Sequence, residues 1–382
     1  MEMNMLVATE EKTPEYWYGI ADRIAAKIGE TAAAHDREGS FVAENYDLLR
    51  EAGLIGAAVP VELGGDGMDH ATLCGVVRRI GRGCGSTALA FSMHCHQVAV
   101  AAWRWQHMQA PTDGLLRGVA AENLVLVSSG GSDWLQGAGT ATKVEGGFRI
   151  DARKVFSSGC QAGSLLMTSA VYDDPDAGAT VLHFAVPFSA EGVTILDTWD
   201  TMGMRGTGSH DVELKAVFVA DAAVSGRRPQ GKWHPLFHII SMIAFPLIYS
   251  AYLGVAEGAY DAALEAARKK PANAGLVALT GEMQNAVWTA ETALAAMIAT
   301  AATAQPGPET TSRVMTGRTV AGRAAIRTVE LALEVGGGGA FYRKSPIERA
   351  FRDIQGARFH PLQEPAQLEL AGRLALGLDI DG

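Results

Sequence analysis

The chain has 382 residues, of which 48% are hydrophobic and 19% charged, and its formal net charge is −10. This length and composition indicate a soluble protein with two or three domains, and the negative charge argues against a nucleic-acid or anionic-membrane partner. The four cysteines show no Cys-x-x-Cys spacing, so the pattern indicates neither a zinc site nor a disulfide framework. The acidic first 17 residues lack a signal-peptide pattern, so we expect a cytoplasmic protein.

Residues 1–120 are predicted to form an N-terminal helical domain. After Pro14, apolar residues recur at the three-to-four spacing of a helix, from Trp17 to Ile28. Further helices are predicted over residues 40–52 and 70–83 and from about residue 86 onward.

Residues 121–228 have a different pattern and are predicted to form a middle β domain. Short β-branched or aromatic runs alternate as strands do, and turn residues separate them. The runs include residues 148–150, 166–168, 181–184 and 212–214. Strands at this spacing predict a small antiparallel barrel or sandwich.

Residues 229–382 are predicted to form a C-terminal helical bundle. The expected helices cover residues 237–268, 276–304, 309–335, 346–358 and 363–378. Residues 239–256 are uncharged and close to the length of a membrane-spanning helix. Because Pro246 interrupts this stretch and no basic flanks frame it, we interpret it as a bundle centre or subunit interface.

Five segments, in chain order, carry a family resemblance. They read VPVELGGDG (59–67), STALAFSMH (86–94), LVSSGGSD (126–133), TMGMRGTGSHDV (201–212) and GGAFYRKSPIERAFRD (338–353). Together they resemble the acyl-CoA dehydrogenase superfamily. The resemblance implies an α+β fold with a helical domain, a β domain and a helical bundle in that order. It also implies a flavin between the β domain and the bundle, and a homotetramer built as a dimer of dimers.

The resemblance places small hydroxyl and glycine residues at the flavin, where backbone and hydroxyl donors can approach closely. In the β domain these are Ser128, Ser129, Gly131, Ser132 and Ser157. Ordinary turns explain such serines equally well. In the bundle, the resemblance places Gly337 and Gly338 near the cofactor and gives Arg268 a phosphate contact, although a helix C-terminal turn alone would explain the glycines.

The chain departs from the family at the catalytic base. Acyl-CoA dehydrogenation needs a carboxylate that takes the substrate α-proton, and the family's glutamate usually lies nine residues after the arginine of the Arg-Asp pair. Counting from Arg352 reaches Pro361, and the alternative position on the first bundle helix (238–255) contains no Asp or Glu. Glu364 is the remaining candidate substitute. The family's R-x-x-F-G motif is also incomplete after Arg268.

In both departures, the missing base and the incomplete motif, the chain resembles the flavin-dependent monooxygenases of this fold. These enzymes receive reduced flavin from a separate reductase and react it with O2. Their F-x-S-G segment is matched by residues 156–159, and their histidine after the Arg-Asp pair by His360. The resemblance implies that Ser158 hydrogen-bonds the flavin N5 region and steadies a C4a-(hydro)peroxyflavin. It also implies that His360, with an ordinary pKa of about 6.5, orients the substrate or exchanges a proton with it. A helix-junction residue ahead of a proline is the alternative role for His360.

The substrate pocket is predicted to include His94, Phe91, Trp134 and Met242, although a core role for His94 and Trp134 is equally consistent with the pattern. The leading hypothesis is an oxygenase that uses diffusible reduced FAD or FMN and O2 on a small aromatic or nitrogen-containing substrate such as an indole or phenol. A divergent acyl-CoA dehydrogenase is the first alternative. A flavin-free structural paralogue that keeps only the tetramer is the second.

Overall fold

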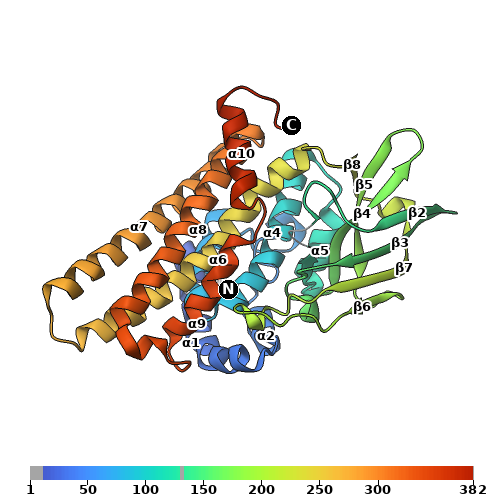
Figure 1. Cartoon of the computed structure of the whole chain (residues 1–382). Coiled ribbons are helices and arrows are strands. Elements are labelled where there is room, and N and C mark those ends of the chain that lie inside the picture. Colours follow the sequence, from blue (N-terminus) through green and yellow to red (C-terminus); the bar gives the residue numbers. More distant parts are fainter. Residues whose placement is uncertain (1–11, 130–132, 382) are drawn as a thin grey trace, which may run out of the picture.

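Helices from both ends of the chain form one body, and a curved sheet lies beside it (Figure 1). The structure, a computed structural model, describes residues 12–129 and 133–381. The N-terminal helices are α1 (Pro14–Glu38), α2 (Ala43–Glu51), α3 (His70–Gly83), α4 (Gly85–Met108) and α5 (Asp113–Glu122). The starts of α1 and α3 are set by side chains: Thr13 accepts a hydrogen bond from the Tyr16 N–H, and Asp69 accepts one from the Thr72 N–H.

The middle of the chain forms a mixed sheet. Its strands are β1 (Leu126–Ser128), β2 (Thr140–Val144), β3 (Gly147–Lys154), β4 (Leu165–Asp174), β5 (Gly178–Pro187), β6 (Val193–Ile195), β7 (Val212–Ala220) and β8 (Gly226–Pro229). The strand order is β6-β7-β3-β2-β4-β5-β8, and β1 pairs with β4. The four predicted strand segments all fall within strands.

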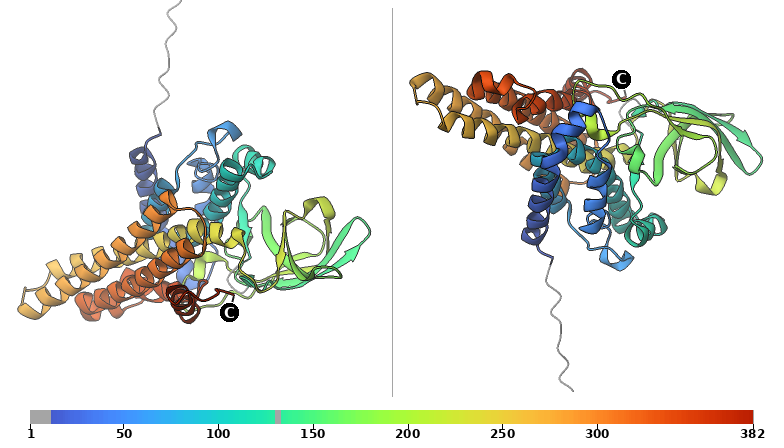
Figure 2. Two further views of the ribbon diagram at one scale, coloured as in Figure 1. Left: turned by 90° about the horizontal axis from the view of Figure 1, so that it is seen from above. Right: turned by 90° about the horizontal axis from the view of Figure 1, so that it is seen from below.

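The predicted antiparallel barrel or sandwich needs correction. Both β1 and β2 run parallel to β4, and the path of paired strands over the described residues runs from β6 to β8 without closing. Strand spacing reports local hairpins, whereas these parallel pairings join segments far apart in the chain, so the spacing could not predict them. The sheet is strongly curved, as Figure 2 shows.

The remaining helices form the bundle. They are α6 (Pro235–Arg268), α7 (Ala274–Thr303), α8 (Pro308–Gly336), α9 (Pro346–Asp353) and α10 (Glu364–Ala375). Among the described residues, α6 and α7 are long and apolar enough to cross a membrane, but such length and composition are weak evidence for a span. The most apolar 18-residue window of α6 is 94% buried, as a bundle centre requires, whereas that of α7 is 28% buried. The paired α7 and α8 extend away from the sheet (Figures 1 and 2).

Two glycines let α3 and α6 cross at close range. A Cβ atom added to Gly254 would lie 2.1 Å from the Arg78 carbonyl oxygen, and one added to Gly81 would lie 2.7 Å from the Ala251 carbonyl oxygen. The N-terminal helices and the bundle therefore share one core, with α6 running through it.

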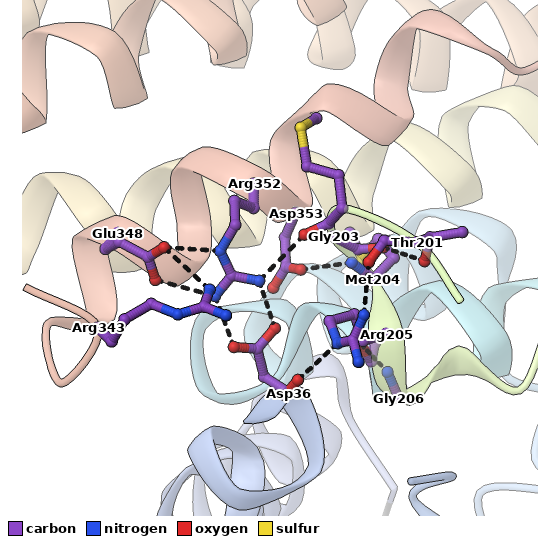
Figure 3. Close-up of polar contacts among 12 residues, drawn as sticks. Asp36, Thr201, Gly203, Met204, Arg205, Gly206, Arg343, Glu348, Arg352 and Asp353 are labelled. Atoms are coloured by element: carbon purple, nitrogen blue, oxygen red, sulfur yellow. Dashed lines mark hydrogen bonds and ion pairs between the residues drawn. The ribbon is translucent and has the colours of Figure 1, made fainter. Parts of the chain in front are cut away.

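A polar network joins the loop before β7 to the first and last thirds of the chain (Figure 3). The Arg352 guanidinium forms paired hydrogen bonds with Asp36 on α1 (2.7 and 2.5 Å) and contacts Glu348 one turn earlier on α9. The Asp353 carboxylate accepts a hydrogen bond from the Met204 N–H at 2.5 Å. Gly203 leaves room for this contact, because a Cβ atom there would lie 2.2 Å from the Arg352 carbonyl oxygen. The network fixes α9, and therefore the turn that carries His360.

Candidate functional site

A cavity of about 310 Å³ lies where the sheet meets α4 and the start of α6. Its walls come from α4, from β4, β5 and β8, from residues 234–248 and from the turn at His360 and Pro361. Ligand sites are typically concave, largely apolar and provided with a few polar groups. This cavity has both kinds of lining, and it is the candidate functional site.

Aromatic rings form the apolar wall of the cavity. Trp134 packs edge-to-face against Phe237 and Phe245, with ring centroids 4.8 and 6.0 Å apart. The structure thus places Trp134 in the cavity wall, where the sequence pattern predicts it. The Trp134 Nε1–H is buried and has no hydrogen-bond partner in the described part of the chain. A buried donor of this kind is costly, so a ligand acceptor at this position would be favourable.

His360 lines the cavity, and two helices hold it in place. Its Nε2 atom lies 2.7 Å from the Tyr252 hydroxyl of α6, and its carbonyl oxygen accepts a hydrogen bond from Arg318 of α8 at 2.7 Å. Burial, followed by the charge of Arg318, lowers the pKa of His360 to about 3. The expected pKa of about 6.5 is therefore wrong for this environment. The imidazole is neutral at physiological pH and is suited to orienting a ligand through a hydrogen bond.

Three predicted pocket residues lie in the core and do not line the cavity. Phe91 and Met242 are fully buried. His94 is also buried, and both of its ring nitrogens are engaged: Nε2 with the Ile55 carbonyl oxygen and Nδ1 with the Leu126 N–H. These contacts hold α4 to β1, so His94 has a structural role here. His96, two residues later, lines the cavity instead, and burial lowers its pKa to about 4.

The predicted flavin serines separate into two groups. Ser128 and Ser129 line the cavity, and the Ser129 hydroxyl lies 2.7 Å from that of Thr168. Ser157 is buried and donates to the Lys154 carbonyl oxygen, which closes a turn. Ser158 is half-buried and shares a hydrogen bond with Ser209, 2.7 Å away, but it does not line the cavity. Gly131 and Ser132 lie outside the described residues.

Three other predicted cofactor residues lie at the opposite end of α6. Arg268 is exposed and follows Phe245 by 23 residues, which is roughly 35 Å of helix. Gly337 and Gly338 begin the turn after α8, beside Lys270, whose ammonium group donates to the Val335 and Gly336 carbonyl oxygens. Within one chain, therefore, Arg268 and these glycines are not brought together with the cavity.

The described lining contains one carboxylate, Asp133. Asp133 forms an ion pair of 2.6 Å with Lys154, whose side chain is fully buried. Glu364, the candidate substitute base, lies outside the cavity, and its exposed carboxylate is paired with Arg323. That pairing lowers the pKa of Glu364 and keeps it a solvated surface carboxylate.

Several cavity residues were missed from the sequence. Arg228 lines the cavity because alternation within the short strand β8 buries this side chain and leaves that of Arg227 exposed. His183 lines the cavity from β5, and Tyr252 holds His360. The uncharged sequence of α6 indicated that Tyr252 lies in the core, but it could not indicate the contact with His360.

Family models match three consecutive parts of the chain. They are the acyl-CoA dehydrogenase N-terminal domain (residues 19–106), middle domain (128–217) and C-terminal domain (247–365). The chain belongs to the acyl-CoA dehydrogenase superfamily. The match covers both the sheet and the helices that enclose the cavity.

Superfamily members of differing activity are similar to this chain over nearly its whole length. A putative acyl-CoA dehydrogenase, YdbM of Bacillus subtilis, is 27% identical and covers 95% of this chain and 97% of its own. The L-evernosamine nitrososynthase of a Micromonospora species is 28% identical, and the alignment covers 95% of this chain and 89% of the nitrososynthase. The dibenzothiophene monooxygenase of Mycolicibacterium goodii is 29% identical, and the alignment covers 92% of this chain and 91% of the monooxygenase.

Solved structures show the same architecture. KijD3, in complex with FMN and a dTDP-linked amino keto sugar, superposes with a TM-score of 0.89 at 26% identity, covering 97% of this chain and 95% of its own. FMN-bound TdsC from Paenibacillus sp. A11-2 superposes with a TM-score of 0.84 at 20% identity, and the superposition covers 96% of this chain and 99% of TdsC. The likeness to TdsC concerns the fold alone.

Proposed function

We propose that this protein is a flavin-dependent monooxygenase that uses reduced flavin and O2 to oxygenate a small aromatic or nitrogen-containing substrate. The observation that carries the proposal is the cavity lining: a neutral histidine, His360, occupies the wall, and the one described carboxylate is engaged by Lys154. Dehydrogenation of an acyl thioester needs a free carboxylate near the α-carbon. Oxygenation by a flavin does not. A nitrososynthase and a monooxygenase among the relatives support the proposal.

The cavity has features that suit a flavin edge or a flat substrate. Ser128 and Ser129 supply hydroxyl groups, and Trp134 supplies a buried N–H that has no partner among the described residues. The aromatic wall suits a planar ring system. FMN is bound in KijD3, which supports FMN as the proposed cofactor. The incomplete R-x-x-F-G motif after Arg268 is also consistent with a flavin that is not held through an adenine half. We propose that the flavin arrives in reduced form from a separate reductase.

The chain's own residues would bind and orient the reactants. When bound, the reduced flavin supplies the chemistry that activates O2. The cavity holds the substrate ring against Trp134 and Phe237, and His360, fixed by Tyr252, offers it a neutral imidazole. The role proposed for Ser158, a hydrogen bond to the flavin N5 region, rests on the family resemblance, because its hydroxyl pairs with Ser209 and does not line the cavity. The finer proposal of a C4a-(hydro)peroxyflavin rests on the family resemblance.

Rapid mixing of the protein and chemically reduced FMN with O2 tests the proposal. We expect a flavin–oxygen adduct with a lifetime well beyond that of free reduced FMN, together with oxygenated product when indole is present. Immediate oxidation of the flavin without adduct or product would contradict it. Anaerobic bleaching of bound FAD by an acyl-CoA would instead support the dehydrogenase, and failure to bind any flavin would support the structural paralogue.

The same proposal includes a homotetramer. The outward side of α7 exposes two large apolar side chains, Val277 at 62% and Trp288 at 61%. The window of α7 with high hydropathy is 28% buried within one chain, so most of this helix is available for a second copy. Assembly would also allow Arg268 and Gly337 of one chain to approach the cavity of another, which they do not reach within their own chain.

A further inference from the structure

The cavity carries an excess of positive charge although the chain as a whole is acidic. Its lining includes Arg104 and the buried Arg228, together with the exposed Arg227, which is paired with Asp174. The described lining contributes one carboxylate, Asp133, which is paired with Lys154. The formal net charge of the chain is −10. A cationic cavity in an acidic protein favours an anionic ligand, because low-dielectric walls strengthen the local field.

Arg228 is the most buried of these cations. The residue is 2% exposed, and its guanidinium donates to the Trp134 carbonyl oxygen at 2.8 Å and to His183 Nε2 at 3.1 Å. It also lies 4.5 Å from the centroid of the Phe237 ring. Burial lowers the pKa of Arg228 to about 10, so the side chain remains charged at neutral pH. Its partners within the described part of the chain are neutral, and a buried cation without an anion is unfavourable.

Two histidines beside Arg228 present N–H groups. The Nε2 atom of His183 accepts the hydrogen bond from Arg228, so the neutral ring carries its proton on Nδ1. The Nδ1 atom of His234 accepts from the Leu236 N–H, so its proton is on Nε2. Burial lowers the pKa of both rings, and the charge of Arg228 contributes to each shift, which keeps them neutral. Both side chains line the cavity.

Arg104 completes this group from α4. It is half-buried, and its guanidinium has no ion-pair or hydrogen-bond partner over residues 12–129 and 133–381. Its charge contributes to the lowered pKa of His183, which places the two side chains in the same electrostatic environment. We call Arg104, His183, Arg228 and His234 the basic end of the cavity.

We propose that the basic end binds an anionic group, a carboxylate or a phosphate, of an aromatic ligand whose ring lies against Trp134 and Phe237. Arg104 and Arg228 supply charge, and the two histidines supply neutral donors, a combination that suits the two or three oxygens of such a group. The identity of the ligand as substrate or flavin rests on the proposed function, but the anion preference does not. The anion is either an acidic group on the substrate or the phosphate of FMN.

Equilibrium binding under anaerobic conditions separates these sources. Isothermal titration compares indole with indole-2-carboxylate on flavin-free protein, and oxidised riboflavin with FMN in a second pair. We expect the anionic member of at least one pair to bind about tenfold more tightly, equivalent to about 1.4 kcal/mol. Preference for indole-2-carboxylate identifies the substrate as the source, and preference for FMN alone identifies the flavin phosphate.

Arg104→Met is the decisive variant, because Arg104 has no described partner whose loss would unfold the protein. It should reduce the anion preference to about threefold or less. The matched control is Arg117→Met on α5, which removes the same charge from an exposed position outside the cavity and should leave the preference intact. Arg228→Met should act as Arg104→Met does, provided that circular dichroism shows it to be folded.

Equal binding within both ligand pairs, or a preference that survives Arg104→Met, would overturn the inference. The outcome is independent of the proposed oxygenase activity, because no turnover is measured. A protein that oxygenates indole without preferring an anion would overturn the basic end alone. A protein that prefers indole-2-carboxylate but forms no product from reduced FMN and O2 would overturn the proposed function alone.

Discussion

At the scale of single residues, the sequence drew attention to His360 as a catalytic candidate but did not predict its protonation state. The missing glutamate in the count from Arg352 drew attention to this turn, and the structure places His360 in the cavity wall. Its lowered pKa comes from burial and from Arg318 on α8, which is 42 residues away in sequence. A sequence pattern carries no information on burial by a distant helix, so it could not predict the neutral ring.

Replacing His360 by alanine should reduce coupling, the ratio of product formed to flavin oxidised, by about ten- to a hundredfold, because the substrate loses an oriented hydrogen bond. Flavin affinity should change little. Tyr252→Phe should lower coupling in the same direction, since it removes the hydroxyl that fixes the imidazole. Phe359→Ala, at an exposed neighbouring residue outside the cavity, is the control. Unchanged coupling in His360→Ala would exclude the proposed role.

Above pH 5, titration of His360 should also have no effect on the pH dependence of product formation. Its pKa of about 3 means that the imidazole stays neutral from pH 5 to pH 8. Comparison of the pH profiles of the wild-type protein and His360→Gln tests this. The two profiles should have the same shape over that range, differing in height only. An inflection near pH 6.5 that is present in the wild-type protein and absent from the variant would show an ordinary, titrating histidine.

Asp353 should make stability fall as pH rises. Burial raises the pKa of this carboxyl to about 6 in the folded protein, against an ordinary value of 3.8. The folded state therefore binds the proton more tightly, and the stability contribution is present below about pH 4 and lost as pH rises through 6. The shift corresponds to roughly 3 kcal/mol. Urea unfolding of wild-type and Asp353→Asn protein, compared at pH 4 and pH 7, should show the wild type losing up to that amount relative to the variant. A pH-independent difference would contradict the expectation.

At the scale of elements, helices were predicted well and strand pairing was not. Predicted and observed bounds agree within a few residues for α3, α6, α7 and α8, because a proline, glycine or capping residue marks most of their ends. The strands themselves were also found. The parallel pairing of β1 with β4 depends on α4 and α5 bringing β1 to the sheet, which is a tertiary arrangement beyond the reach of local alternation.

The crossing of α3 and α6 gives an element-scale prediction. Gly254→Ala should destabilise the protein by about 1–3 kcal/mol, because the new methyl group would collide with the Arg78 carbonyl oxygen. Gly372→Ala on α10 is the matched control: no described atom lies within 4 Å of the added Cβ, and alanine should stabilise the helix by roughly 0.5–1 kcal/mol. Thermal unfolding should therefore move in opposite directions for the two variants. A Gly254→Ala protein as stable as the wild type would show that the helices separate easily.

At the scale of the whole molecule, the family resemblance predicted the order of domains, and the matching domain models confirm it. The resemblance could not show that the predicted cofactor residues separate within a chain. Ser128 and Ser129 lie at the cavity, whereas Arg268 and Gly337 lie at the far end of α6. A single flavin could contact both sets only if a second chain supplies one of them, so the assembly bears directly on cofactor binding.

Trp288→Glu tests that assembly. Light scattering after size exclusion should give the wild-type protein four times the 40.2 kDa mass of one chain. Trp288 is 61% exposed on α7, and burying an added carboxylate at a chain–chain contact is unfavourable, so the variant should form smaller species. Thr142→Glu on β2 adds the same charge to the sheet and should leave the mass unchanged. If Arg268 completes the flavin site of another chain, FMN affinity should fall together with the mass in Trp288→Glu and not in Thr142→Glu. A Trp288→Glu protein of unchanged mass would place the contact elsewhere on the surface.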